Sequence, residues 1–210
     1  MFAHLRVKNW PFDVLALEIS ESLQKKSGVL RILDIGAGSG HYWLNAPLLD
    51  LTLNNRVELN FLDAHGKINK THNNQIKFIN KFVGIAPGAL SQFSDSEFDI
   101  VLAFDLIEHL TKTDGYILLY EMDRISGNKK IILTPNGWVW QPPSSNNKFN
   151  AHLSGWRVKD FKGAGYRKIR GMLGAKFLLG PYAIPKKNKF IFDALVWKIF
   201  STLTLSLIHI

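Results

Sequence analysis

The chain has 210 residues, of which 46% are hydrophobic, and it contains no cysteine. A chain of this size can bury a substantial core, and its length predicts one domain over residues 1–204 rather than two. The absence of cysteine excludes disulfide scaffolds, thiolate zinc sites and cysteine nucleophiles, so a metal would need oxygen and histidine ligands.

The formal net charge is +9 at pH 7. Positive potential concentrates polyanions near a protein, which makes nucleic acid and phospholipid surfaces candidate partners. The basic residues are scattered along the chain, however, without an arginine-rich arm or a nucleic-acid-binding motif. We therefore interpret them as a solvated basic surface and keep nucleic acid as the alternative.

Apolar periodicity predicts strands that alternate with helices along the chain. The predicted strands are residues 29–35, 57–63, 76–79, 98–104, 130–133 and 166–172. The predicted helices are residues 11–27, 41–53, 116–124 and 156–164. This alternation favours a parallel sheet with helices on both faces.

The two ends of the chain carry separate expectations. The first residues lack an apolar stretch of signal-peptide length, so the expected location is the cytoplasm. Residues 190–204 are rich in bulky apolar side chains but contain Asp193 and Lys198, which favours packing, or contact with a membrane surface, over a membrane span. Residues 205–210 resemble a translated transposon adapter, so we interpret them as a non-native tail and expect that a final strand could be missing.

A glycine-rich turn follows the first predicted strand, with glycines at positions 36, 38 and 40. Glycine lets the backbone turn tightly and approach a ligand, and a helix after the turn would present free N–H groups. A dinucleotide-binding fingerprint would place its third glycine one position later, where this chain has His41. The spacing favours an adenosylmethionine loop, and a nicotinamide-dependent oxidoreductase is the alternative.

Asp63 ends the predicted strand at 57–63. It follows Gly40 by about the number of residues expected of an acid that accepts hydrogen bonds from ribose hydroxyls. The alternative interpretation is an aspartate that caps a helix.

Four strings together resemble class I S-adenosylmethionine-dependent methyltransferases of the type 11-like group, particularly bacterial members with a DxIEHL block after the fourth strand. They are LDIGAGSG at 33–40, FDIVLAFDLIEHL at 98–110, TPNG at 134–137 and HLSGWRVKDFKGAGY at 152–166. The resemblance covers residues 29–180. It implies a doubly wound, Rossmann-like α/β fold with a cofactor half at 29–110 and an acceptor-side half at 111–204.

The resemblance also implies which residues bind S-adenosylmethionine. They are Asp34, Gly36, Ala37, Gly38, Gly40, Asp63 and Asp105. Of these, Asp63 would hold the ribose and Asp105 would stand beside the transferred methyl group. Many relatives have an acid after the third strand that contacts adenine, whereas residues 82–87 contain none, so the adenine contacts are not assigned.

Methyl transfer from a sulfonium is an in-line displacement with an activated donor, so the enzyme mainly aligns the acceptor and excludes water. A hydroxyl or amine acceptor must also lose a proton. His109 is the candidate base, with Glu108 beside it as the second catalytic candidate. Alternatively, both residues only cap and orient the following helix.

A metal site is an alternative for the same residues. Asp105, Glu108 and His109 lie close together in the sequence, and His152 follows the TPNG string. This layout looks like that of small-RNA 2′-O-methyltransferases, whose two acids and two histidines hold a divalent ion. Here Asp105 replaces a glutamate, and His152 could lie far from the others, so no metal is the favoured prediction.

The acceptor is expected to be an O or N atom of a small molecule, a sugar or a lipid-linked compound. A long irregular segment at 138–147 with Trp138 and Trp140, together with Trp156, would suit a pocket wall, although these aromatic residues could equally be core. A noncatalytic adenosylmethionine-binding module is a further alternative.

Overall fold

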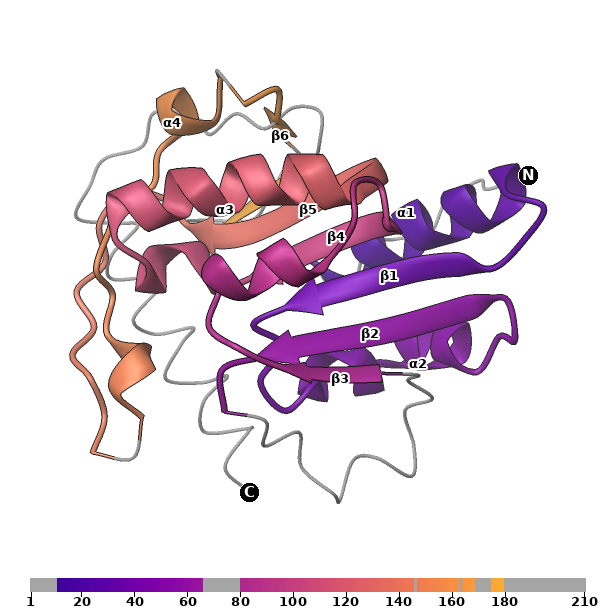
Figure 1. The fold of residues 1–210 in the computed structure, drawn as a ribbon, viewed down its shortest axis with the longest axis horizontal. Helices are drawn as coiled ribbons and strands as arrows, with labels where there is room; N and C mark the ends of the chain where they lie inside the picture. Colours follow the sequence, from indigo (N-terminus) through magenta and orange to yellow (C-terminus); the bar gives the residue numbers. More distant parts are fainter. Residues whose placement is uncertain (1–10, 66–79, 146, 163, 169–174, 180–210) are drawn as a thin grey trace. The chain divides into compact units, whose positions relative to one another are not determined.

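The computed structural model describes residues 11–65, 80–145, 147–162, 164–168 and 175–179. These residues form an α/β fold that divides into two compact units. The first unit takes in the described residues up to Ala103 and Glu121–Lys130, and the second takes in Phe104–Tyr120 and the described residues from Ile131 onward. Figure 1 labels most of the elements.

The first unit is built on four parallel strands in the order β3-β2-β1-β4. Their bounds are β1 Leu30–Ile35, β2 Val57–Asp63, β3 Asn80–Val83 and β4 Phe98–Phe104, the last residue of which belongs to the second unit. Nearly every residue of β1, β2 and β4 is buried, as expected for parallel strands covered on both faces. Because Ile35 pairs with Leu62, the carboxyl ends of β1 and β2 lie side by side.

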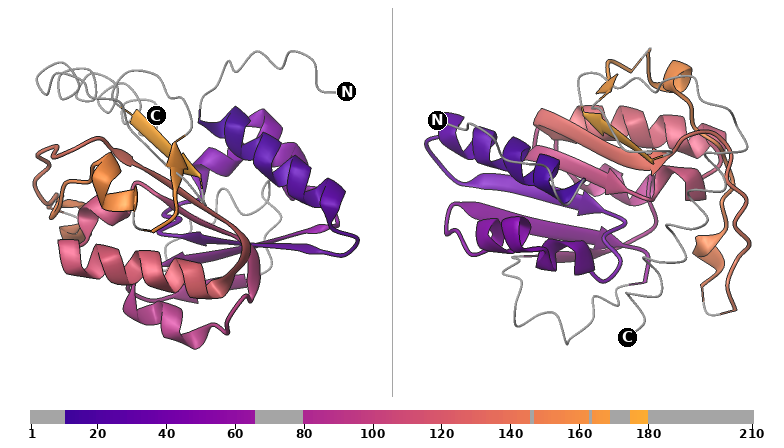
Figure 2. Two further views of the ribbon diagram at one scale, coloured as in Figure 1. Left: turned by 90° about the horizontal axis from the view of Figure 1, so that it is seen from above. Right: turned by 180° about the vertical axis from the view of Figure 1, so that it is seen from behind.

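Two helices pack together in this unit. α1 (Phe12–Lys25) buries Leu15, Ile19 and Leu23, which recur at helical spacing on one face. α2 (Ala46–Thr52) packs against both α1 and β2. Figure 2 shows the two helices together on one face of these strands.

In the second unit, the carboxyl-terminal half of β5 (Ser126–Pro135) pairs with β7 (Ala175–Leu179), and β7 pairs with β6 (Arg167–Lys168). Both pairings are antiparallel. The helices are α3 (Lys112–Ile125), whose last residues belong to the first unit, and the short α4 (Val158–Lys162).

Trp156 is the centre of the second unit's core and is 1% exposed. Its Nε1–H donates to the backbone oxygen of Ile107 at 3.1 Å and to Ser154 Oγ at 2.8 Å. The Lys112 ammonium lies 3.6 Å from the centroid of the indole ring, a favourable cation–π contact. The indole lies so close to α3 that only a glycine, Gly115, fits beneath it.

The strands predicted at 29–35, 57–63 and 98–104 are confirmed within one residue as β1, β2 and β4. The prediction of a single helix over 41–53 is wrong. The chain forms a 3-10 helix, η1 (His41–Leu44), and then α2. Pro47 has no N–H with which to continue a helix from the preceding turn, so the two segments separate.

The sheet also differs from an all-parallel one. No strand is predicted at 175–179, where the structure has β7, and β7 runs antiparallel to β5. Of the strand predicted at 166–172, the structure describes residues 166–168, which include β6. The helix predicted at 156–164 is shorter in the structure, where it is α4. The strand predicted at 76–79 lies outside the described residues.

The membrane expectation concerns residues 190–204, which lie outside the described part of the chain, as does the tail at 205–210. Within the described part, none of the helices combines the length and the apolar character that crossing a bilayer requires.

The contact between α3 and Trp156 predicts that Gly115→Ala destabilises the second unit. A Cβ at this position would lie 2.1 Å from Trp156 Cζ2. Overpacking typically costs about 1–3 kcal/mol, which exceeds the helix-propensity gain of about 1 kcal/mol from replacing glycine. We expect a lower free energy of unfolding in urea.

The matched control is Gly28→Ala, because a Cβ at Gly28 meets no atom within 4 Å. Equal unfolding free energies for the two variants would contradict the packing of Trp156 on α3.

Candidate functional site

The loop after β1 has a backbone that requires glycine at alternate positions. Gly36, Gly38 and Gly40 have φ angles of 72°, 55° and 69°, in the left-handed region that other residues adopt at a cost. At Gly40 an added Cβ would lie 2.7 Å from the ring of Phe61, whereas at Gly38 it would meet no atom within 4 Å. Gly40 therefore packs on β2, and Gly38 leaves bare backbone facing open space.

The end of β2 holds this loop in place. The N–H of Gly36 donates to the backbone oxygen of Leu62 at 2.7 Å. Asp63 accepts hydrogen bonds from the N–H of Gly38 at 2.9 Å and from the N–H of His65 at 2.8 Å, one on each carboxylate oxygen. Asp63 thus orients the loop, and the lone pairs that remain on its oxygens can still accept from a ribose. The ribose contact stays a prediction.

Asp34 lies behind the loop and is 1% exposed. Its Oδ2 accepts hydrogen bonds from the Tyr42 hydroxyl and, at 2.8 Å, from Trp43 Nε1, while its Oδ1 has no hydrogen-bond partner among the described residues. Burial raises the pKa of Asp34 to about 7, against the opposing effect of the two hydrogen bonds. The side chain is therefore close to half protonated at neutral pH.

A second group of polar residues lies in the second unit, where β4 ends. Asp105 has a φ of 46°, and its N–H donates to the backbone oxygen of Leu133 in β5 at 2.9 Å. The chain then enters a short 3-10 helix, η3 (Ile107–His109). A left-handed residue other than glycine is strained and is often found at functional sites.

Glu108 is buried in η3, with 3% of its surface exposed. Its Oε2 accepts a hydrogen bond from Thr134 Oγ1 at 2.9 Å, and its carboxyl group also bonds that of Asp105. Burial, reinforced by the negative charge of Asp105, raises the pKa of Glu108 well above its ordinary value. Ionisation of the Glu108 carboxyl group is therefore costly in this buried position.

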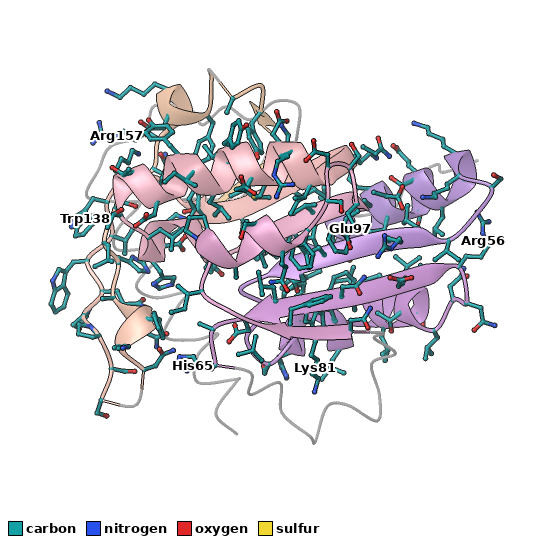
Figure 3. All side chains as sticks on the ribbon, in the orientation of Figure 1. Arg56, His65, Lys81, Glu97, Trp138 and Arg157 are labelled. Atoms are coloured by element: carbon teal, nitrogen blue, oxygen red, sulfur yellow. The ribbon has the colours of Figure 1, made fainter. Side chains whose placement is uncertain are left out.

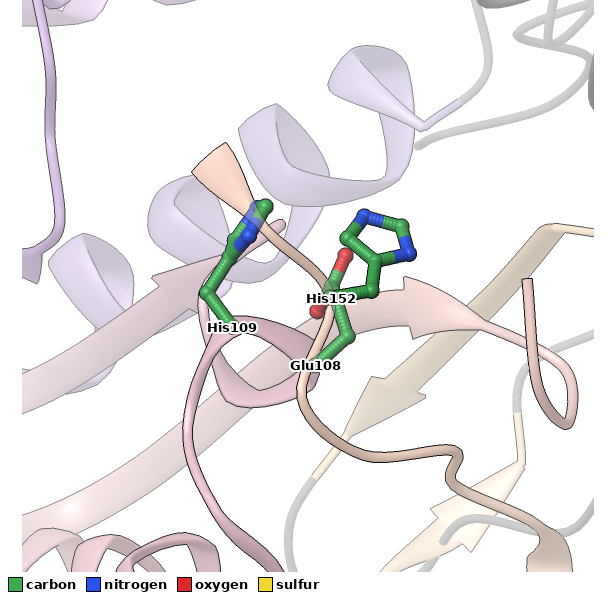
Figure 4. A group of neighbouring side chains, drawn as sticks. All are labelled: Glu108, His109 and His152. Atoms are coloured by element: carbon green, nitrogen blue, oxygen red, sulfur yellow. The ribbon is translucent and has the colours of Figure 1, made fainter. Parts of the chain in front are cut away.

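His109 and His152 face each other, with ring centroids 4.8 Å apart (Figure 4). Nδ1 of His109 lies 3.1 Å from the backbone oxygen of Ala151, and Nδ1 of His152 lies 2.7 Å from that of Val139. Burial lowers the pKa of both imidazoles, more than these carbonyl contacts raise it. Both rings are therefore neutral at pH 7.

The segment that carries His152 is tied directly to η3. The N–H groups of Leu153 and Ser154 both donate to the backbone oxygen of Glu108, at 2.8 and 3.1 Å. As a result, Glu108, His109 and His152 each place one potential metal-ligand atom within 4.8 Å of the others. Asp105 is not part of this group, although its carboxyl group contacts Glu108.

Comparison with known proteins gives a clear result for the fold alone. Neither a family model nor a curated protein matches the sequence. Among solved structures, the CurJ carbon methyltransferase aligns with a TM-score of 0.59 and 13% identity over 79% of this chain and 52% of that one. The carbon methyltransferase (CMeT) domain of the citrinin polyketide synthase aligns with a TM-score of 0.57 and 17% identity over 82% and 52%.

A third structure is the magnesium protoporphyrin IX methyltransferase from Synechocystis PCC 6803, solved with bound S-adenosylmethionine. It aligns with a TM-score of 0.50 and 12% identity over 80% of this chain and 76% of that one. This chain has the class I methyltransferase fold. It spans about half the length of the first two structures.

Within the methyltransferase fold, the predicted cofactor residues fall into two sets. Those from Asp34 to Gly40 gather with Asp63 around one loop of the first unit. Asp105 belongs to the second unit, beside Glu108, and its contact with a cofactor stays a prediction. His152, whose position the sequence left open, joins Glu108 and His109.

Sequence reasoning missed the partners of the buried acids. Tyr42 and Trp43 bond Asp34, and two aromatic residues directly after the glycine loop were the available signal. Thr134 bonds Glu108 and begins the TPNG string, which had no assigned role. Of the three tryptophans considered for a pocket wall, Trp156 is core, whereas Trp138 (labelled in Figure 3) and Trp140 are 41% and 74% exposed.

The raised pKa of Asp34 predicts a pH-dependent stability that Asp34→Asn removes. The folded state binds this proton more tightly than the unfolded state, in which the pKa is about 3.8, so the contribution of Asp34 to stability falls as the pH rises from about 4 to 7. Each pH unit in that window lowers the contribution of Asp34 to the free energy of unfolding by about 1.4 kcal/mol. Relative to wild type, Asp34→Asn should gain a few kcal/mol in unfolding free energy between pH 4.5 and pH 8.

Urea denaturation at several pH values measures this difference, with Asp50→Asn on the exposed side of α2 as the control. A difference between Asp34→Asn and wild type that does not change with pH would show that Asp34 is ionised throughout the range.

Proposed function

We propose that this chain is an S-adenosylmethionine-dependent methyltransferase that transfers a methyl group to an O or N atom of a small-molecule, sugar or lipid-linked acceptor. The observation that carries the proposal is the glycine loop at the end of β1. Its alternating left-handed residues are locked onto Leu62 and Asp63, and at Gly38 the backbone is open to a ligand. The structures with the same fold are named as methyltransferases, one of them for a porphyrin acceptor, which supports a small-molecule acceptor.

The residues around the loop fit the charge pattern of S-adenosylmethionine. The cofactor, when bound, supplies a methyl group activated on a cationic sulfonium. Asp34 keeps a buried carboxyl oxygen without a partner among the described residues, and a cationic ligand nearby would favour the ionised form of this acid. Gly38 allows close backbone approach, and Asp63 presents acceptor oxygens suited to ribose hydroxyls.

For the acceptor's proton, we propose that His109 acts as the base. The carbonyl of Ala151 can only accept a hydrogen bond, so Nδ1 of His109 carries the hydrogen and Nε2 keeps its lone pair. The ring is neutral and half-buried, so an acceptor can reach it. Glu108, which is buried and accepts a hydrogen bond from Thr134, would help to orient the acceptor rather than act as a second base.

The cofactor proposal predicts saturable binding of S-adenosylhomocysteine by isothermal titration calorimetry. Gly38→Arg should abolish the binding heat, because the arginine side chain would occupy the open face of the loop and the left-handed backbone disfavours it. Gly28→Arg is the matched control, since Gly28 is exposed and precedes the opposite end of β1.

A parallel titration with NADH tests the oxidoreductase alternative. Binding of NADH without binding of S-adenosylhomocysteine would overturn the methyltransferase proposal. Tight S-adenosylhomocysteine binding without turnover over a broad acceptor panel would instead indicate a noncatalytic module.

The base proposal predicts that His109→Ala lowers kcat by about 10²–10⁴-fold, the usual contribution of a general base. The affinity for S-adenosylhomocysteine should not change, because the loop that binds it is built from other residues. Methyl transfer to an acceptor found by screening is measured across a pH range, with and without added imidazole. Unchanged kcat in the variant would reject the role.

A further inference from the structure

We propose that Glu108, His109 and His152 form a binding site for a divalent first-row transition-metal ion, with one carboxylate oxygen and one nitrogen from each imidazole as ligands. The three side chains converge from η3 and from the segment after β5, as Figure 4 shows. Their potential ligand atoms all lie within 4.8 Å of one another. The binding itself does not depend on the proposed methyltransferase activity.

The donor set selects the kind of ion. Imidazole nitrogen suits zinc, iron, cobalt and nickel, whereas magnesium and calcium prefer sites made of oxygen atoms. Two imidazoles with a single carboxylate therefore favour zinc, iron(II) or cobalt(II) over magnesium. Because the chain has no cysteine, no thiolate can compete for such an ion.

The hydrogen bonds around the cluster prepare the rings to coordinate. The backbone oxygens of Ala151 and Val139 can only accept, so Nδ1 of each histidine carries the hydrogen and Nε2 is the nitrogen with a free lone pair. Outer contacts of this kind fix the tautomer and the orientation of metal-binding imidazoles in proteins. Thr134 likewise fixes one oxygen of Glu108.

The spacing of the ligand atoms is close to what a bound ion needs. Two ligand atoms that each lie about 2.1 Å from a tetrahedral ion are about 3.4 Å apart. The present limit of 4.8 Å therefore requires the side-chain ends to approach one another by at most about 1.4 Å. The backbone can stay as it is, because Leu153 and Ser154 already tie the His152 segment to Glu108.

Three protein ligands would leave at least one coordination position open, as at catalytic rather than structural metal sites. An acceptor hydroxyl bound at that position would become more acidic. With the ion in place, Nε2 of His109 is a ligand and its role as a base is confined to the metal-free protein. This consequence, which favours an oxygen acceptor, rests on the proposed function.

The test uses the untagged full chain after removal of metal by a chelator. Cobalt(II) is added, and its visible absorption reports nitrogen coordination, while calorimetry measures zinc(II) and magnesium(II) binding. We expect one cobalt or zinc ion per chain and no binding of magnesium at the same concentration. His109→Ala and His152→Ala should each lose the cobalt spectrum, whereas His65→Ala, which removes an exposed histidine, should keep it.

Thr134→Val is the milder variant, because it removes only the hydrogen bond to Glu108 and should weaken zinc binding about 10–100-fold. Urea denaturation and S-adenosylhomocysteine titration of each variant report whether it folds. If a histidine variant fails to fold, the zinc affinity of Thr134→Val decides whether the proposed metal site is correct, and an unchanged affinity would contradict it.

A folded wild-type chain that binds no cobalt or zinc would overturn the proposal. So would cobalt binding that survives in both folded histidine variants, or that is lost equally in His65→Ala. Loss of S-adenosylhomocysteine binding alone would overturn the proposed function and leave the metal site standing.

Discussion

The candidate cofactor loop depends on one backbone constraint, which is the left-handed conformation of three residues placed alternately after β1. For a residue with a Cβ this conformation costs roughly 1–2 kcal/mol each, and glycine at positions 36, 38 and 40 removes that cost. The parallel pairing of β1 with β2 then sets Leu62 and Asp63 beside the loop, so that their oxygens receive its N–H groups. Hydrogen bonds within the protein thus hold the turn without any ligand.

Both units contain a buried carboxyl group that is costly to ionise. Asp34 is held by Tyr42 and Trp43, and Glu108 is held by Thr134. In each case burial raises the pKa more than the hydrogen bonds lower it. Such groups reduce stability, and their presence at the ends of β1 and β4 is typical of sites where polar chemistry matters more than packing.

Packing and polar contacts in the second unit reinforce each other. Trp156 fills the space beside Gly115 and bonds Ile107, so the residue that anchors the core also fixes the start of η3. The chain just before Trp156 bonds the backbone of Glu108. The position of His152 relative to His109 is consequently set by the same contacts that hold the unit together.

The sequence by itself determined the strands at the centre of the first unit and the glycine loop, because buried runs and the need for a positive φ are local properties. It also identified Glu108, His109 and His152 as candidates. Only the tertiary structure decided that His152 joins the other two, since that depends on backbone hydrogen bonds between residues more than forty positions apart in the chain. The antiparallel course of β7 and the burial of Trp156 likewise follow from contacts between distant segments, which no local pattern encodes.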